Sequence, residues 1–395
     1  MTVTVQSALP DQAGQGSGAS SLNTLILAIS AIGFVVCVGF VLSTLGAQGH
    51  TAFNTNNDGM FWGLPIVVYD FFLLTSTGLA MTATVGLAMG LKDFAAIAKR
   101  CLWLALAGLA GGVLALFLEL GHPFRALWAI PFSFQFQSPL YWKVLFVGAY
   151  VASLLVLLVK TSRPGWTIQS VRGTAIALLI TALAVSMIAG SVFGMMVMRP
   201  FWFGGEIPVA FHVESMLGGL AFAVFFTYLA YGFDQSRMPA RVQGLFRDRL
   251  PFAFSLIISL HAMFVGARTV SGLWTNADGL QVWDVIASSP LFYAEIFIGI
   301  ALPLVLMLMP SMRAKGNVQI LSAVLVMLAL FAARYDFIIG GQMVAPFKGS
   351  WVDGLLSYTP SMTEWLLLLA AIFLANLVNA AGQRFLNLDQ GPADV

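Results

Sequence analysis

Charged side chains are scarce in this chain. Lys, Arg, Asp and Glu make up 9% of its 395 residues, whereas about 25% is usual for a soluble domain. Hydrophobic residues make up 59%, and the mean hydropathy is +0.89. This balance excludes an ordinary soluble domain and indicates an integral membrane protein surrounded by lipid. The basic residues form no patch with interleaved aromatic residues, so no nucleic-acid partner is predicted.

Cysteine and histidine are also rare, with two and four residues. Cys37 and Cys101 lack metal-ligand spacing and fall in or beside apolar runs, where cysteine usually acts as a small buried hydrophobe. Only His212 and His261 fall clearly inside apolar runs, which excludes the paired ligands of a diheme cytochrome. We therefore expect no metal, iron–sulfur cluster or haem bound by this chain, although a single haem between these two histidines stays open.

Ten apolar runs are each long enough to cross a membrane, which takes about 20 helical residues. They lie near residues 22–46, 64–91, 99–119, 141–160, 171–197, 208–233, 251–273, 289–309, 318–340 and 361–383. The predicted fold class is therefore an all-α membrane protein with about ten transmembrane helices. Residues 1–21 lack the basic start of a secretory signal, and their polar composition predicts a flexible N-terminal tail.

One segment of the sequence occurs twice. SPLYWKVLFVGA at 138–149 is similar to SPLFYAEIFIGI at 289–300, and LPIVVY at 64–69 is similar to IPVAFH at 207–212. Copies in the same order at similar separations predict that one four-helix unit is used twice. The units would be a first bundle over 64–200 and a second bundle over 201–347. A flanking helix and loop over 22–63 would precede them, and a flanking helix and tail over 348–395 would follow.

Basic residues are unevenly divided between alternate connections. Thirteen of the 19 Lys and Arg residues fall on one side of the membrane and the other six on the opposite side. The positive-inside rule places the richer side, and with it both termini, in the cytoplasm. The runs 64–91 and 208–233 then both point inward, so the repeat is predicted to be parallel, about an axis along the membrane normal.

Ionisable side chains inside the apolar runs gather toward the predicted outer side. A charge at the membrane centre costs at least about 2.5–3.5 kcal/mol, so such residues are usually paired, line a cavity or serve a function. Any single one of these residues could be explained as part of an ion pair that fixes the packing of the bundles. Their clustering on one side favours a functional role for the group. The candidates for a proton path are His212, Glu214, His261, Arg268, Glu295, Arg334 and Asp336.

The densest polar group follows the third run. A carboxylate, an imidazole and a phenol beside aromatic rings can hydrogen-bond the two oxygens of a quinone and exchange protons with them. Pro123 predicts that the segment after His122 is a surface loop rather than a continued helix. The predicted quinone-binding residues are Tyr69, Asp70, Glu119, His122, Arg125, Ser138, Tyr141 and Trp142, with Lys143 beside them.

The strings LELGHPFR, QSPLYW, RPFWFGGEIP and RYDFIIGGQ together resemble the NrfD-type family. Its members are the membrane subunits of polysulfide reductase and related molybdenum or hydrogenase complexes. The resemblance covers residues 64–345, and ten helices look like the longer branch of the family. Glu119, His122 and Arg125 match the family's acid-Gly-His-Pro-Arg motif, in which aspartate is commoner than glutamate.

The resemblance implies two four-helix bundles side by side, a quinone site near the outer surface and no prosthetic group. It also implies electron exchange with an extracytoplasmic ferredoxin-like subunit that carries [4Fe–4S] clusters, often attached to a molybdopterin catalytic subunit. The expected function is a quinone-reactive anchor of a multisubunit oxidoreductase in the bacterial cytoplasmic (inner) membrane. Menaquinone and ubiquinone both stay open as its exchangeable substrate, and so does proton translocation.

The alternative function is a stand-alone secondary transporter with parallel repeats and buried charges. A transporter of this kind usually breaks its helices near the middle of the membrane. Here the Pro and Gly residues that would break helices lie mainly at the ends of the apolar runs, which favours the anchor.

Overall fold

A computed structural model describes residues 17–55, 59–275, 280–345 and 354–394. Within these ranges the chain is all α, with no strand. Residues 1–16 of the predicted tail (1–21) lie outside the described residues. The predicted boundary between residues 347 and 348 lies outside them as well. Helix α1 begins at Ser17, earlier than the predicted residue 22.

The described part contains ten helical stretches that are long and apolar enough to span a membrane, as predicted. The helices that form them are α1 (Ser17–Gln48), α2 (Leu64–Leu87), α3 (Ala95–Glu119), α5 (Pro139–Thr161), α6 (Ile168–Gly194), α7 (Ile207–Ala230), α9 (Arg249–Trp274), the broken span made by α11 (Pro290–Tyr293), η5 (Ala294–Ala301) and α12 (Leu302–Leu308), α14 (Gly316–Gly340) and α15 (Met362–Phe385). Short helices connect them: η1 (Gly49–Ala52), η2 (Lys92–Phe94), α4 (Pro123–Ala129), η3 (Pro131–Ser133), η4 (Gln235–Arg237), α8 (Ala240–Arg247), α10 (Val282–Ser288) and α13 (Pro310–Arg313).

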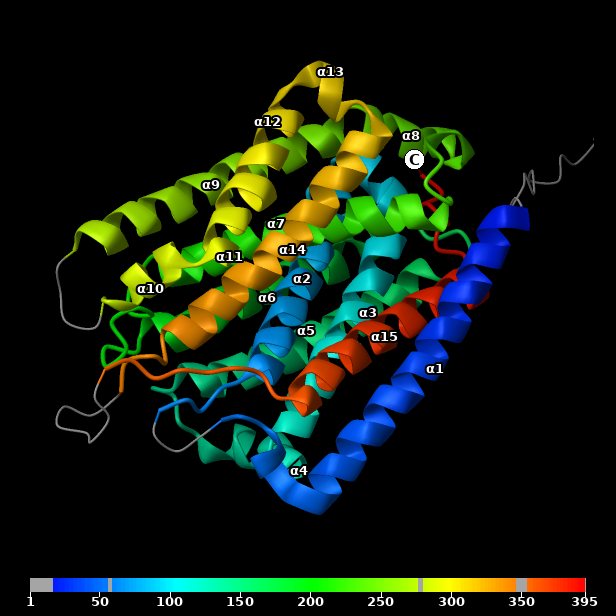
Figure 1. The fold of residues 1–395 in the computed structure, drawn as a ribbon. Coiled ribbons are helices and arrows are strands. Elements are labelled where there is room, and N and C mark those ends of the chain that lie inside the picture. Colours follow the sequence, from blue (N-terminus) through cyan, green and yellow to red (C-terminus); the bar gives the residue numbers. More distant parts are fainter. Residues whose placement is uncertain (1–16, 56–58, 276–279, 346–353, 395) are drawn as a thin grey trace, which may run out of the picture.

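The contacts between the spanning helices form two adjoining rings. In Figure 1, α9 and α12 lie on one side of the molecule and α1 and α15 on the other. In one ring, α2 and α5 each contact both α3 and α6. In the other, α7 and the broken span each contact both α9 and α14. Helix α2 contacts α7 and α14 and thereby joins the rings, whereas α15 packs on α3 and α1 packs on α15. The two rings consist of the helices of the predicted first and second bundles. That the two bundles are copies of one four-helix unit stays a prediction.

Small residues let α2 and α7 cross closely at the junction of the rings. A Cβ atom on Gly78 would collide with the backbone carbonyl of Ser215, and one on Gly219 would collide with the backbone of Gly78. Thr77 and Ser215 share a hydrogen bond of 2.8 Å between their hydroxyl groups. Small residues and hydroxyl bonds of this kind are typical of helix contacts inside membranes.

The broken span contains a π-helical stretch, η5, which carries Glu295. Pro303, just beyond η5, has no N–H group and cannot donate the usual α-helical hydrogen bond to the carbonyl of Gly299. A local widening to the π-helix is one way for a helix to accommodate such a disruption. The sequence predicted one continuous helix over 289–309.

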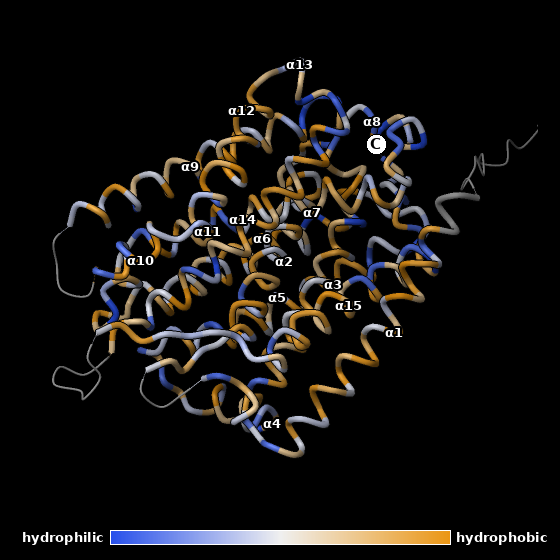
Figure 2. The backbone as a smooth tube through the Cα atoms, in the orientation of Figure 1, coloured by the Kyte–Doolittle hydropathy of each residue, from blue (hydrophilic) through white to orange (hydrophobic). Residues whose placement is uncertain are grey.

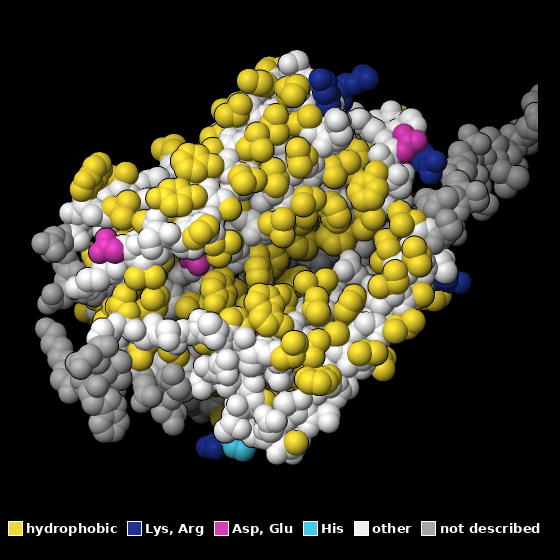
Figure 3. All heavy atoms as spheres, viewed as in Figure 1, with side chains coloured by type: hydrophobic (Ala, Val, Ile, Leu, Met, Phe, Trp, Pro, Cys, Tyr) yellow, Lys and Arg dark blue, Asp and Glu magenta, His cyan; other side chains and the backbone are white. Residues whose placement is uncertain are grey.

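The surface has the polarity expected of a lipid-facing protein. Hydrophilic residues are concentrated near α8 and in loops, whereas hydrophobic residues predominate along the spanning helices (Figure 2). The face in Figure 3 is mostly hydrophobic, with basic side chains at its edges and a hollow near its centre. Large side chains on the lipid side of α1, among them Ile32 and Val35, are 66% and 68% exposed in the isolated chain.

Candidate functional site

Four charged side chains, three of them buried, form a chain of ion pairs across the junction of the rings. Lys143 Nζ lies 3.7 Å from Asp70 Oδ1, and Arg334 Nε lies 3.4 Å from Asp70 Oδ2. The Arg334 guanidinium also donates a hydrogen bond to the Glu214 carboxylate. Asp70 is completely buried, and Lys143 and Arg334 are nearly so. Two acids and two bases therefore compensate one another in a place where an uncompensated charge would be costly.

One aromatic ring lies beside Lys143, and a group of aromatic rings lies at the start of α5. Lys143 Nζ lies 4.9 Å from the centre of the Tyr69 ring, a cation–π distance. Tyr141 is buried and makes edge contacts with Phe136 and Trp142, each at 5.5 Å between ring centres. Of the predicted quinone-binding residues, Tyr69 and Asp70 thus lie together, with Lys143 linking them to the start of α5.

The motif residues Glu119, His122 and Arg125 lie nearer the surface. Glu119 ends α3 and is half-buried, while His122 and Arg125 are exposed. Neither the His122 side chain nor the Arg125 side chain forms a hydrogen bond or ion pair with the described residues. The chain does leave the helix after Glu119, as Pro123 predicted, but it then forms the short helix α4 rather than a loop. Ser138 is half-buried at the residue before α5.

Glu364 lies at the start of α15. Its side chain is completely buried. Oε2 accepts hydrogen bonds from the backbone N–H groups of Asn54 and Ser361, at 3.2 and 2.7 Å, and Oε1 accepts one from the Tyr358 hydroxyl. Tyr358 in turn accepts a bond of 2.7 Å from the backbone N–H of Leu64, at the start of α2. Glu364 therefore joins α15 to the helix that carries Tyr69 and Asp70.

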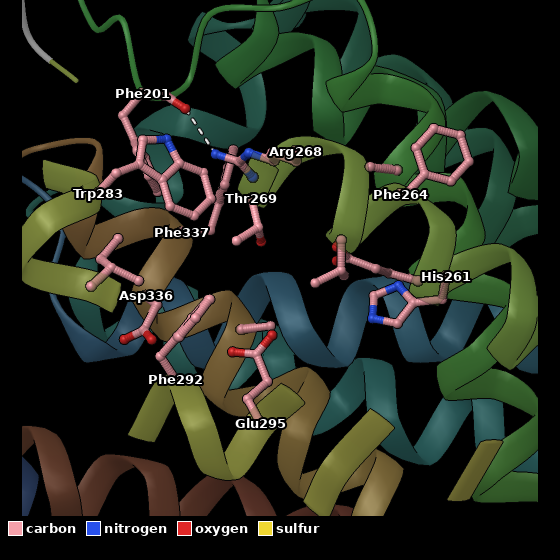
Figure 4. A pocket seen from close by; sticks show the side chains of 15 residues that line it. Phe201, His261, Phe264, Arg268, Thr269, Trp283, Phe292, Glu295, Asp336 and Phe337 are labelled. Carbon is pink, nitrogen blue, oxygen red and sulfur yellow. Dashed lines mark hydrogen bonds between the residues drawn. The ribbon is translucent and has the colours of Figure 1, made fainter. Parts of the chain in front are cut away.

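A pocket opens inside the second ring, among α7, α9, α10, η5 and α14 (Figure 4). It contains about 620 Å³ of space free of atoms, its open mouth included. Five of the predicted proton-path residues line it: Glu214, His261, Arg268, Glu295 and Asp336. Aromatic side chains, including Phe201, Trp283, Phe292 and Phe337, form much of the remaining wall.

Arg268 is fixed at one side of this pocket. It donates a hydrogen bond of 2.8 Å to the backbone carbonyl of Phe201. Its guanidinium carbon lies 4.7 Å from the centre of the Phe201 ring and 4.6 Å from that of Phe337. Figure 4 shows Arg268 and Thr269 on one side of the open space and Glu295 and Asp336 on the opposite side.

The other two proton-path candidates lie outside the pocket lining. His212 shares a hydrogen bond of 2.9 Å with Ser186 of α6. Because His212 and Glu214 are two residues apart on α7, they point to nearly opposite faces of the helix, so His212 faces away from His261. Arg334 does not line the pocket; it belongs to the chain of ion pairs that includes Asp70. Within the described ranges, no group of three or more His, Cys, Asp or Glu side chains is arranged to hold a metal ion.

Comparison with known proteins identifies the family. The model of the polysulphide reductase family NrfD matches residues 52–346. The chain belongs to the NrfD family. It is 22% identical over 386 residues to a selenate reductase subunit of Mesobacillus selenatarsenatis, with 86% of this chain and 88% of that protein covered. It is 20% identical over 385 residues to the Hdr-like menaquinol oxidoreductase integral membrane subunit of Archaeoglobus fulgidus, with 93% of each covered.

This NrfD-family chain also has site residues that sequence reasoning missed. Lys143 was noticed only as a neighbour, because nothing local shows that it reaches Asp70, 73 positions earlier in the chain. Glu364 and Tyr358 were not singled out at all. The string SMTE at 361–364 is a capping-box pattern, which could have shown that Glu364 begins a helix. It could not have shown the contact with Tyr358 and Leu64.

Proposed function

We propose that this chain is the quinone-reactive membrane subunit of a multisubunit oxidoreductase. It would exchange electrons between the quinone pool and an extracytoplasmic ferredoxin-like subunit with [4Fe–4S] clusters, attached to a molybdopterin or related catalytic subunit. The support is the family and the functions of its relatives, one of them a menaquinol oxidoreductase subunit. We place the chain in the bacterial cytoplasmic membrane with both termini inside, on the distribution of Lys and Arg.

The proposed quinone site lies at the outer end of the first bundle. The observation that carries it is the Tyr69 ring beside the Asp70–Lys143 pair, with the aromatic rings around Tyr141 at the start of the helix that carries Lys143. Tyr141 and Trp142 would hold the quinone ring, and Glu119 would lie between this site and the surface. His122 is exposed, so it can exchange protons with water directly.

The proton chemistry follows from the reaction of a quinol. Oxidation of a hydroquinone to a quinone releases two electrons and two protons, and the reverse reaction takes them up. In the oxidising direction the electrons would pass to the iron–sulfur partner, and the protons would pass to Glu119 and His122 and then to the outer water. Proton translocation across the whole membrane would require a further path, for which the second-ring residues stay the predicted candidates.

The test uses the intact complex, purified in mild detergent, with its co-purifying subunits identified. His122→Ala should lower quinol-linked turnover by at least about 100-fold, the lower range for a lost acid–base group. Electron transfer between the partner subunits and artificial dyes should stay unchanged. His50→Ala is the matched control, because His50 is an exposed histidine at the same end of the molecule. Equal quinol kinetics in the two variants, or the absence of any redox partner subunit, would contradict the proposal.

A further inference from the structure

Two acidic side chains and a histidine line the pocket of the second ring. Glu295 is 7% exposed and His261 is 2% exposed. Asp336 Oδ2 is a buried atom without a hydrogen-bond partner among the described residues. Glu295 and His261 face the pocket, and no hydrogen bond or ion pair joins their side chains to another described residue. A buried polar group without a partner destabilises the folded protein. The Asp336 oxygen and the Glu295 and His261 side chains surround one open space, which indicates that a ligand or water supplies their hydrogen bonds.

The arrangement of these groups fits a flat ring with an oxygen at each end. Arg268 and Thr269 can donate hydrogen bonds from one side, and Glu295 and Asp336 face them across the space (Figure 4). His261 can donate or accept according to its tautomer. The aromatic walls, with Phe292 and Phe337 among them, suit the faces of such a ring. A quinone oxygen accepts hydrogen bonds and a hydroquinone hydroxyl donates them, so both redox forms find complementary groups here.

The repeated sequence segment, 138–149 and 289–300, also indicates a site at this pocket. Tyr141 and Phe292 occupy the same position in the two copies, three residues after Ser138 and Ser289. Both serines directly precede a helix that begins with proline, in α5 and in α11. Phe292 lines the pocket, and Glu295 follows it by three residues. The copied segment therefore places an aromatic ring beside polar groups in both rings of helices.

We propose that this pocket is a second binding site for the ring of an isoprenoid quinone, separate from the site at Tyr69 and Tyr141. The chemical class of the ligand rests on the proposed function, but the site itself rests on the pocket. The site binds the ring in exchange with the membrane pool. A pocket filled by water alone, serving proton transfer or only packing, is the competing outcome.

Binding stoichiometry of the purified complex tests this proposal. The probe is a hydroxyquinoline N-oxide, a quinol analogue whose fluorescence is quenched on binding. The unmodified complex should bind two molecules. Glu295→Gln and, independently, Phe292→Ala should each weaken one of the two sites at least tenfold, which equals about 1.4 kcal/mol, and leave the other unchanged. The retained site shows that the variant is folded. Phe297→Ala is the matched control, because Phe297 lies on the same segment and is 62% exposed.

The outcomes separate the two proposals. A single site that His122→Ala weakens and both pocket variants leave intact would overturn the second site alone. A single site that the pocket variants weaken and His122→Ala leaves intact would keep the pocket and overturn the proposed first-bundle site. No binding to the unmodified complex would contradict both.

Discussion

Arg334 Nε lies 3.4 Å from Asp70 Oδ2, and the same guanidinium bonds Glu214. Asp70 belongs to α2 of the first ring, and Glu214 belongs to α7 of the second and lines its pocket. One buried cation therefore holds an acid from each ring. This contact links the proposed quinone site to the second-ring pocket. The junction of the rings therefore depends on ion pairs as well as on close packing of α2 and α7.

Asp70→Asn should destabilise the protein strongly. The change leaves the buried Lys143 without its acidic partner and leaves Arg334 paired with Glu214 alone. Breaking a buried ion pair costs about 3–5 kcal/mol. The measurement is thermal unfolding of the purified protein in detergent. Asp93→Asn is the matched control, because its ion pair with Arg249 is about half exposed and such pairs contribute about 0–1 kcal/mol. Equal unfolding temperatures for the two variants would show that the chain of ion pairs does not stabilise the junction.

Gly78→Ala should separate α2 from α7. The added Cβ would collide with backbone rather than with a movable side chain, so overpacking should cost about 1–3 kcal/mol or more. Gly148→Ala in α5 is the control, because a Cβ there has no atom within 4 Å. Thermal unfolding in detergent should show a clear loss for the first variant and little change for the second. If Gly148→Ala is as damaging, close approach at Gly78 is not the cause.

Tyr358 should make stability depend on pH in the alkaline range. Burial raises its pKa above the ordinary value of 10, and the neighbouring Glu364 carboxylate raises it further. A folded-state pKa above the unfolded one means that this contribution to stability is fully present below about pH 10 and is lost as pH rises through the folded pKa. Tyr358→Phe removes the phenol, and with it the bonds to Glu364 and Leu64, which should cost about 1–3 kcal/mol at pH 8. Unfolding measured from pH 8 to 11 should show a smaller alkaline loss in the variant; identical slopes would assign the loss to other groups.

The proton-path prediction is tested by the ratio of protons to electrons. Moving one charge against 100 mV costs about 2.3 kcal/mol, so translocation must be driven by the redox reaction. If Glu214 and His261 carry protons, Glu214→Gln or His261→Ala in the reconstituted complex should lower the protons moved per electron while electron transfer continues. Acidification of liposomes and electron transfer are measured together. An unchanged ratio in both variants would make these residues structural.

The ten spans could be predicted from the sequence because charge is excluded from hydrocarbon, so polar residues mark the helix ends. The predicted run 141–160, for example, corresponds to α5 at Pro139–Thr161. The π-helical break at η5 could not be predicted, because it depends on how Pro303 is accommodated by its neighbours. The short helix α4 was likewise hidden, since Pro123 both ends one helix and begins another.

The candidate site could be predicted only in part. Sequence reasoning found the buried charges, because each is conspicuous in an apolar run. It could not pair Asp70 with Arg334, since packing between distant helices decides which side chains meet. It grouped His212 with His261, whereas the helical periodicity of α7 turns His212 toward Ser186. It also missed Glu364, whose role depends on contacts with Asn54 and Tyr358.

Photochemical labelling tests the central claim most directly. A quinone carrying a photoreactive group on its ring is bound to the purified complex, activated by light, and located by mass spectrometry of peptides from this chain. The account predicts label in the peptides that carry Tyr69 and residues 119–142, suppressed by excess unlabelled quinone. Label confined to partner subunits, or label in this chain that excess quinone does not suppress, would contradict it.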